Sequence, residues 1–317
     1  MWFLLLIAFL MMAGSVPAHA GVRDDSSSLT QDASFTPHAH QFDLQLGDVS
    51  SFVDNSSVVR RHDIVAGTRP ITNRGSALHF GSDLGVRTLQ MPEMTASWWI
   101  DDLNAIQFQF RYFALYGSHH LSQSVTFNRA VITPGQDLSP AGTTWFTGGL
   151  FYEGRVTPWL AVQEHTMPEF LQHWDLRPKI GLEFVYLDFQ LNNAHPRVQS
   201  GGLDARGRWH DQELPVPTIG IEARRALCEN LMLEITGQGN WVNHWDSLRS
   251  ENGTVYLSQS SFETHWTVSY YNAALRGVHP YLGIDYYFYK QAENSHSLGN
   301  LIRLQSFGPE FGVSYSH

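Results

Sequence analysis

The last eight residues of the chain, 310–317, alternate between two kinds of side chain. The residues of one parity are mostly large and apolar: Phe311, Val313, Tyr315 and His317. Those of the other parity are small or polar: Glu310, Gly312, Ser314 and Ser316. Because a β-strand points successive side chains to opposite faces, this segment is predicted to be a strand between lipid and a watery interior. A half-buried edge strand of a soluble sandwich is the alternative.

The same period of two recurs from residue 41 onwards. It is clearest where Ile106, Phe108 and Phe110 alternate with Gln107 and Gln109. The pattern predicts about ten strands, close to the segments 41–52, 92–100, 106–112, 146–155, 180–186, 218–224, 231–238, 265–270, 281–288 and 310–317. Further strands are open at 57–66, 76–86 and 159–173, so the expected range is eight to twelve strands.

The connections between these segments alternate between long and short. Long polar stretches follow the first, third, fifth and seventh segments, and tight turns such as 101–104 and 228–230 lie between them. Such asymmetry is typical of an antiparallel up-and-down β-barrel with long loops at one end. We therefore predict an all-β, transmembrane barrel.

Composition agrees with a barrel in a membrane. Aromatic residues make up 13% of the chain and charged residues only 16%, against about a quarter in soluble proteins. After residue 20 no apolar run approaches the ~20 residues of a membrane helix. The net charge of −10, with no basic run, predicts no nucleic-acid partner. A soluble all-β lectin or sandwich is the alternative.

The chain is predicted to have three parts. Residues 1–20 combine an apolar core with Ala18-His19-Ala20, a small-x-small site, and are predicted to be a signal peptide. Residues 21–40 are polar and are predicted to be a flexible periplasmic lead-in, in which His38 and His40 are solvated. Residues 41–317 are predicted to form the barrel.

The terminal segment resembles the recognition strand that ends Gram-negative outer-membrane β-barrels. The resemblance rests on Phe311, Gly312, Val313, Tyr315 and His317, with the departure that such strands usually end in Phe or Trp. The whole mature chain is similar in pattern to small outer-membrane barrels without an assigned activity. The resemblance implies a place in the cell outer membrane, and an even number of strands then puts both termini in the periplasm. It also implies two partners, outer-membrane lipid and the barrel assembly machinery.

Charged residues of the inward parity are predicted to form a lumen network. They are Arg111, Glu153, Arg155, Glu183, Glu222, Arg224, Glu234, Glu263, His265 and Asp285. Both signs are present, so ion pairs are expected to fill the lumen as a structural plug. A narrow polar path for small solutes, in a porin-like role, is the alternative.

Aromatic residues close to the predicted strand ends are expected to form a girdle at the lipid–water boundary. They are Trp98, Trp99, Trp145, Trp241, Trp266, Tyr286 and Phe288. A carbohydrate-binding platform is the alternative.

An enzyme at the extracellular rim is the competing hypothesis, because outer-membrane proteases and lipid A-modifying enzymes are barrels too. The Asp-x-His element of omptin proteases is absent from this sequence. Ser118 with His119 and His120, or Ser261 with His265, could form a hydrolase pair, although such pairs arise readily by chance. We expect no catalytic residues, no metal and no cofactor. The predicted role is structural, adhesive or that of a narrow pore, with an extracellular ligand as a further partner.

Overall fold

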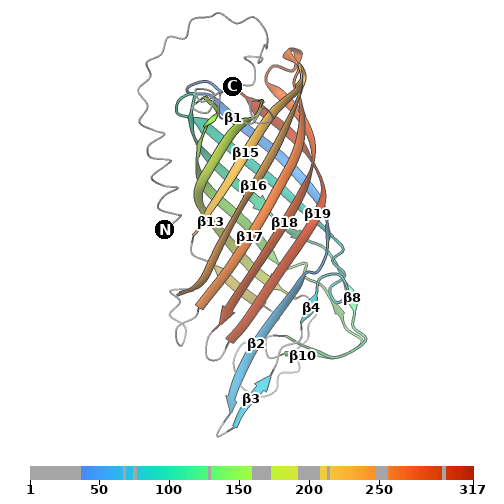
Figure 1. The fold of residues 1–317 in the computed structure, drawn as a ribbon. Coiled ribbons are helices and arrows are strands. Elements are labelled where there is room, and N and C mark those ends of the chain that lie inside the picture. Colours follow the sequence, from blue (N-terminus) through green and yellow to red (C-terminus); the bar gives the residue numbers. More distant parts are fainter. Residues whose placement is uncertain are drawn as a thin grey trace, which may run out of the picture.

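The computed structural model describes residues 37–66, 69–73, 77–127, 130–158, 173–191, 208–212, 215–246, 256–294 and 298–317. Ten antiparallel strands form a closed barrel, in the order β1-β5-β6-β12-β13-β15-β16-β17-β18-β19, and β19 pairs back to β1 (Figure 1). The predicted fold class is confirmed. The predicted signal peptide and most of the lead-in, residues 1–36, lie outside the described residues.

Most of the barrel strands are longer than the alternating segments of the sequence. They are β1 (Phe42–Val53), β5 (Thr88–Trp99), β6 (Asn104–Tyr112), β12 (Thr144–Gly154), β13 (Asp175–Gln190), β15 (Val216–Cys228), β16 (Leu231–Asp246), β17 (Tyr256–Tyr270), β18 (Val278–Asn294) and β19 (Leu298–Ser316). The extensions lie mostly toward the long loops.

The two ends of the barrel differ. At the turn end, β1 begins, β19 ends and the turns 100–103, 229–230 and 271–277 join neighbouring strands, the last with a 3-10 helix, η3 (Ala273–Leu275). At the loop end lie the accessory strands β2 (Ser57–Ala66), β3 (Arg69–Asn73), β4 (Leu78–His79), β7 (Ala114–Leu115), β8 (His119–His120), β9 (Val125–Phe127), β10 (Ala130–Ile132), β11 (Asp137–Leu138) and β14 (Arg208–Gln212). Strand β2 pairs with the start of β19, and β3 pairs with β2 beyond the barrel (Figure 1). The open segment 57–66 is therefore a strand outside the barrel wall.

The terminal segment closes the barrel. Leu46 of β1 faces Val313 of β19, and the backbone of Phe42 exchanges two hydrogen bonds of 3.0 Å with His317. Closure leaves no open edge between β1 and β19. At an open edge in lipid, each backbone group without a hydrogen-bond partner would cost several kcal/mol.

An apolar surface surrounds the barrel. Every barrel strand exposes at least one large apolar side chain: Leu46, Trp98, Phe108, Leu150, Leu182, Ile221, Trp241, Phe262, Leu282 and Phe311. A belt of this extent is unsuited to contact with water, and it matches the lipid-facing band of a transmembrane barrel. Among the described residues, no helix has both the length and the hydropathy needed to cross a bilayer.

The predicted aromatic girdle needs correction at two positions. Trp98, Trp241 and Trp266 are exposed on the outside, and Tyr286 and Phe288 point outward and are half-buried. Trp99 and Trp145 are instead buried inside the barrel. The strand period explains the difference, because Trp99 has the opposite parity to Trp98 and Trp145 has the parity of the inward residue Thr147.

An apolar core fills the lumen at the loop end, and we call it the apolar cap. Its members from barrel strands are Val49, Leu89, Met91, Trp145, Val185, Leu187, Phe189, Tyr287, Tyr289, Ile302 and Leu304. Its members from the connections are Val58, Leu78, Phe80, Leu84, Val86, Phe113, Leu115, Leu121, Val125, Phe127, Ile132, Leu138 and Leu191. Aromatic contacts join the two sets, with ring centroids 4.8 Å apart for Phe113 and Trp145 and 6.1 Å apart for Phe80 and Phe189. The loops are thus folded into the barrel mouth.

Candidate functional site

The turn-end half of the lumen is polar and contains a cavity of about 100 Å³. We call this space the polar chamber. Its lining runs from Asp43 and Ser316, at the turn end, to Glu183 and Thr147, which lie next to the apolar cap. The period of two in each strand produces this lining, because most of the inward residues here are charged, amide or hydroxyl side chains.

Arg111 is the central cation of the chamber. Its guanidinium is buried and lies 2.7 Å from Glu263, 2.9 Å from Glu93 and 3.6 Å from Asp285. Glu263 and Asp285 come from β17 and β18, so these two contacts cross the lumen, whereas Glu93 lies opposite Arg111 on the neighbouring strand β5. A buried guanidinium with several carboxylate partners fixes the strands relative to one another, and removal of one partner leaves a buried charge.

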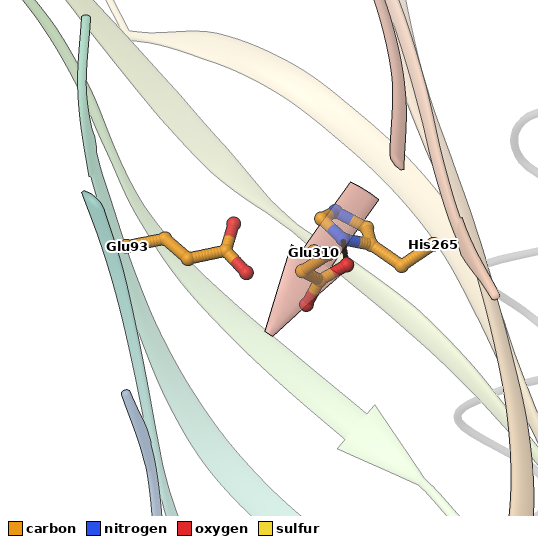
Figure 2. A group of neighbouring side chains, drawn as sticks. All are labelled: Glu93, His265 and Glu310. Carbon is orange, nitrogen blue, oxygen red and sulfur yellow. Dashed lines mark hydrogen bonds and ion pairs between the residues drawn. The ribbon is translucent and has the colours of Figure 1, made fainter. Parts of the chain in front are cut away.

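His265 lies beside this cation and is held at both ring nitrogens. Its Nδ1 is 2.9 Å from Glu310 Oε2 (Figure 2), and its Nε2 is 2.9 Å from Arg111 Nη2. Because a guanidinium can only donate, we assign Nε2 as the acceptor and Nδ1–H as the donor to Glu310. Glu93 points toward the same pair from the other side (Figure 2).

A second network lies closer to the turn end. Arg177 is buried between Asp175 at 2.8 Å, Glu222 at 3.5 Å and Glu153 at 3.6 Å. Arg224 pairs with Glu222 at 2.5 Å and Glu234 at 3.0 Å. The guanidinium of Arg177 also stacks over the Trp99 ring at 4.8 Å, which explains the inward position of that tryptophan.

The structure places all of the sequence-predicted lumen residues inside the polar chamber or at its turn end. Nine of them lie on inward positions of barrel strands, and Arg155 follows β12, where it contacts Asp175 at 2.6 Å. The sequence prediction missed Glu93, Arg177, Lys179 and Glu310. Parity had placed Glu310 on the inward face with Gly312 and Ser314, but the predicted charge network did not include it.

The two candidate hydrolase pairs considered from the sequence are not assembled among the described residues. Ser261 and His265 share the inward face of β17, but they are four positions apart, which is about 13 Å along the strand. At the loop end, His120 contacts Asp137 at 2.8 Å, and both side chains are exposed. No hydrogen bond joins His120 to a hydroxyl group of the described residues.

The barrel's closure, apolar belt and polar interior define it as a transmembrane β-barrel of the outer-membrane type. No protein-family model and no curated protein matches the sequence. Solved structures with a similar arrangement include the outer membrane protease OmpT from Escherichia coli, at 14% identity and a TM-score of 0.44, covering 91% of this chain and 100% of that one.

Two further solved structures are similar. The translocator domain of autotransporter NalP from Neisseria meningitidis has 11% identity and a TM-score of 0.38, covering 90% of this chain and 91% of that one. The outer membrane protein OprG from Pseudomonas aeruginosa has 10% identity and a TM-score of 0.28, covering 88% and 97%. None of these likenesses is strong enough to transfer an activity to this chain.

Proposed function

We propose that the protein is a closed, non-conducting barrel of the outer membrane with a structural or adhesive role. In this proposal the capped loop end faces the outside and the polar chamber opens toward the periplasm, where both termini lie. The observation that carries the proposal is the apolar cap, in which Phe80, Phe113 and Trp145 are fully buried inside the barrel mouth.

The cap opposes conduction for an energetic reason. An ion that crossed the loop end would have to displace packed aromatic and aliphatic side chains and lose its hydration, at a cost of many kcal/mol. Barrels with an open aqueous channel have about 16 strands or more, and smaller barrels are filled by their own side chains. The narrow-pore alternative is therefore less well supported than the closed barrel.

The proposal includes partners of three kinds. Lipid contacts the apolar belt, the barrel assembly machinery recognises β19, and an extracellular ligand would contact the loop end. The protein would act without catalysis and without binding nucleic acid. An enzyme at the rim stays the alternative, and the exposed His120–Asp137 pair would be its first residue pair to test.

Planar-bilayer recording tests the proposal. The refolded wild-type protein is expected to give no steady single-channel steps. A variant in which residues 114–142 are replaced by a short Gly-Ser linker removes Leu121, Phe127 and Leu138 from the cap, and should conduct. Steady single-channel current steps from the wild-type protein, as large as those of the variant, would contradict a closed barrel.

A further inference from the structure

Three potential metal ligands converge inside the polar chamber. Glu93 of β5, His265 of β17 and Glu310 of β19 each offer one ligand atom, and these atoms lie within 4.8 Å of one another (Figure 2). No two of the three strands are neighbours, because β1 lies between β5 and β19, and β18 lies between β17 and β19. Barrel closure alone brings the three side chains together.

The same cluster contains buried carboxylate oxygens without hydrogen-bond donors. Asp285 is fully buried and neither of its oxygens accepts a hydrogen bond, although Oδ2 lies 3.5 Å from His265 Nε2 and 3.6 Å from Arg111 Nη2. Glu310 Oε1 is also buried without a donor. Unsatisfied buried carboxylates are costly, so they indicate a missing positive partner.

The charges point the same way. Glu93, Glu263, Asp285 and Glu310 supply four carboxyl groups around one guanidinium, Arg111, and one imidazole, His265. A divalent cation would offset part of this excess negative charge, which is weakly screened in the lumen.

We propose that Glu93, His265 and Glu310 bind a divalent transition-metal ion, of the Zn²⁺ or Mn²⁺ kind. The 2.9 Å between His265 Nδ1 and Glu310 Oε2 is close to the separation of about 3 Å between adjacent ligands of one ion at ~2.1 Å. One imidazole with two carboxylates suits these ions better than Ca²⁺, which takes oxygen ligands.

Metal binding gives Asp285 a role. When Nδ1 of His265 binds the ion, the ring proton moves from Nδ1 to Nε2, and Nε2–H can then donate to Asp285 Oδ2. Arg111 releases Nε2 and keeps its 2.7 Å contact with Glu263. A carboxylate that accepts from the second nitrogen of a metal-bound histidine is the usual outer-shell partner. Oδ2 of Asp285, which has no donor in the structure, thereby gains one.

The bound ion would tie β5, β17 and β19 together across the lumen, on both sides of the β1–β19 seam. This inference is independent of the proposed function, because a closed and a conducting barrel could both hold the ion.

Metal titration of the full barrel tests the site. The protein must be free of a polyhistidine tag, treated with EDTA, dialysed, and then titrated with Zn²⁺ or Mn²⁺ alone. One ion per barrel and a rise of the unfolding temperature with ion concentration are expected, because ligands that bind the folded state stabilise it.

Substitutions locate the ion. Glu93→Gln and His265→Gln should weaken binding at least tenfold, and Asp285→Asn about tenfold through the outer shell. Glu234→Gln is the matched control, since this chamber carboxylate contacts Arg224 outside the cluster and should leave binding unchanged. Only variants that run as heat-modifiable barrels are compared. The proposal is overturned if the wild-type protein binds no stoichiometric ion, or if Glu93→Gln and His265→Gln bind as well as Glu234→Gln.

Discussion

Three carboxylates of the polar chamber converge on Arg111. Arg111→Ala leaves Glu93, Glu263 and Asp285 without their guanidinium, and we expect a loss of about 3–5 kcal/mol in the free energy of unfolding. The measurement is the midpoint of denaturant unfolding in detergent micelles. Arg87→Ala, at an exposed arginine, is the control and should be near neutral. Equal midpoints for the two variants would show that Arg111 does not hold a buried charge network.

Asp101 controls the turn between β5 and β6. Partial burial raises the pKa of Asp101, but hydrogen bonds from Asn104 and Leu103 outweigh it and lower the pKa overall. A carboxyl group whose pKa is lower in the folded protein than in the unfolded chain stabilises the fold at pH values above its ordinary pKa of about 3.9. This stabilisation is lost as the pH falls through the pKa of the folded state.

Asp101→Ala should therefore be less stable than the wild-type protein at pH 7, by under about 1 kcal/mol because the side chain is exposed. The gap should close as the pH falls below about 4. Unfolding midpoints of the two proteins at pH 7, 5 and 3 measure this difference in stability. A difference that stays constant over this series would contradict the assigned role of the Asp101 carboxylate in the turn.

At the scale of the element, β19 connects the two ends of the sheet. Tyr315 faces outward and Ser314 faces the lumen, while the His317 ring stacks on Tyr315 at 6.2 Å. Tyr315→Asp should abolish assembly because it places a charge on the lipid-facing side of the closing strand. Ser314→Ala should be near neutral, and His317→Phe should preserve assembly or improve it. The yield of heat-modifiable, membrane-inserted protein measures all three, and normal assembly of Tyr315→Asp would show that β19 does not close the barrel in lipid.

Glycines at the seam allow a close approach of side chains and backbone. A Cβ at Gly312 would lie 2.2 Å from the Leu46 carbonyl oxygen and 2.5 Å from the Tyr281 hydroxyl. Gly312→Ala should cost about 1–3 kcal/mol of stability, because the backbone of β1 cannot yield without disturbing its pairing. Gly237→Ala meets nothing within 4 Å and is the matched control. Thermal unfolding of both variants in detergent decides the point, and equal unfolding temperatures would contradict a crowded seam.

At the scale of the whole molecule, the closed wall and apolar belt predict how the protein behaves in cells. The protein should fractionate with outer membranes, and unheated samples should run faster on gels than boiled ones, because a closed barrel resists unfolding by detergent. Recovery as a soluble, heat-indifferent periplasmic protein would contradict a transmembrane barrel.

The sequence by itself determined the barrel wall. Side-chain parity is a local property of a strand, so the alternation at 106–112 and 310–317 was enough to separate the lipid face from the lumen. The same parity placed Arg111, Glu263 and Asp285 inside the barrel before their partners were known.

Only the tertiary structure decided what fills the lumen. The apolar cap depends on loop residues such as Phe80 and Phe127, whose burial against Phe189 arises when the loops fold into the barrel mouth. No local period marks such residues, and the sequence therefore predicted a polar plug throughout.

The meeting of Glu93, His265 and Glu310 also needed the closed sheet. These residues are separated by 172 and 45 positions in the chain (265 − 93 and 310 − 265), and their distances are set by the barrel's curvature and strand register. Parity tells which way a side chain points, whereas register and closure decide which side chains it meets.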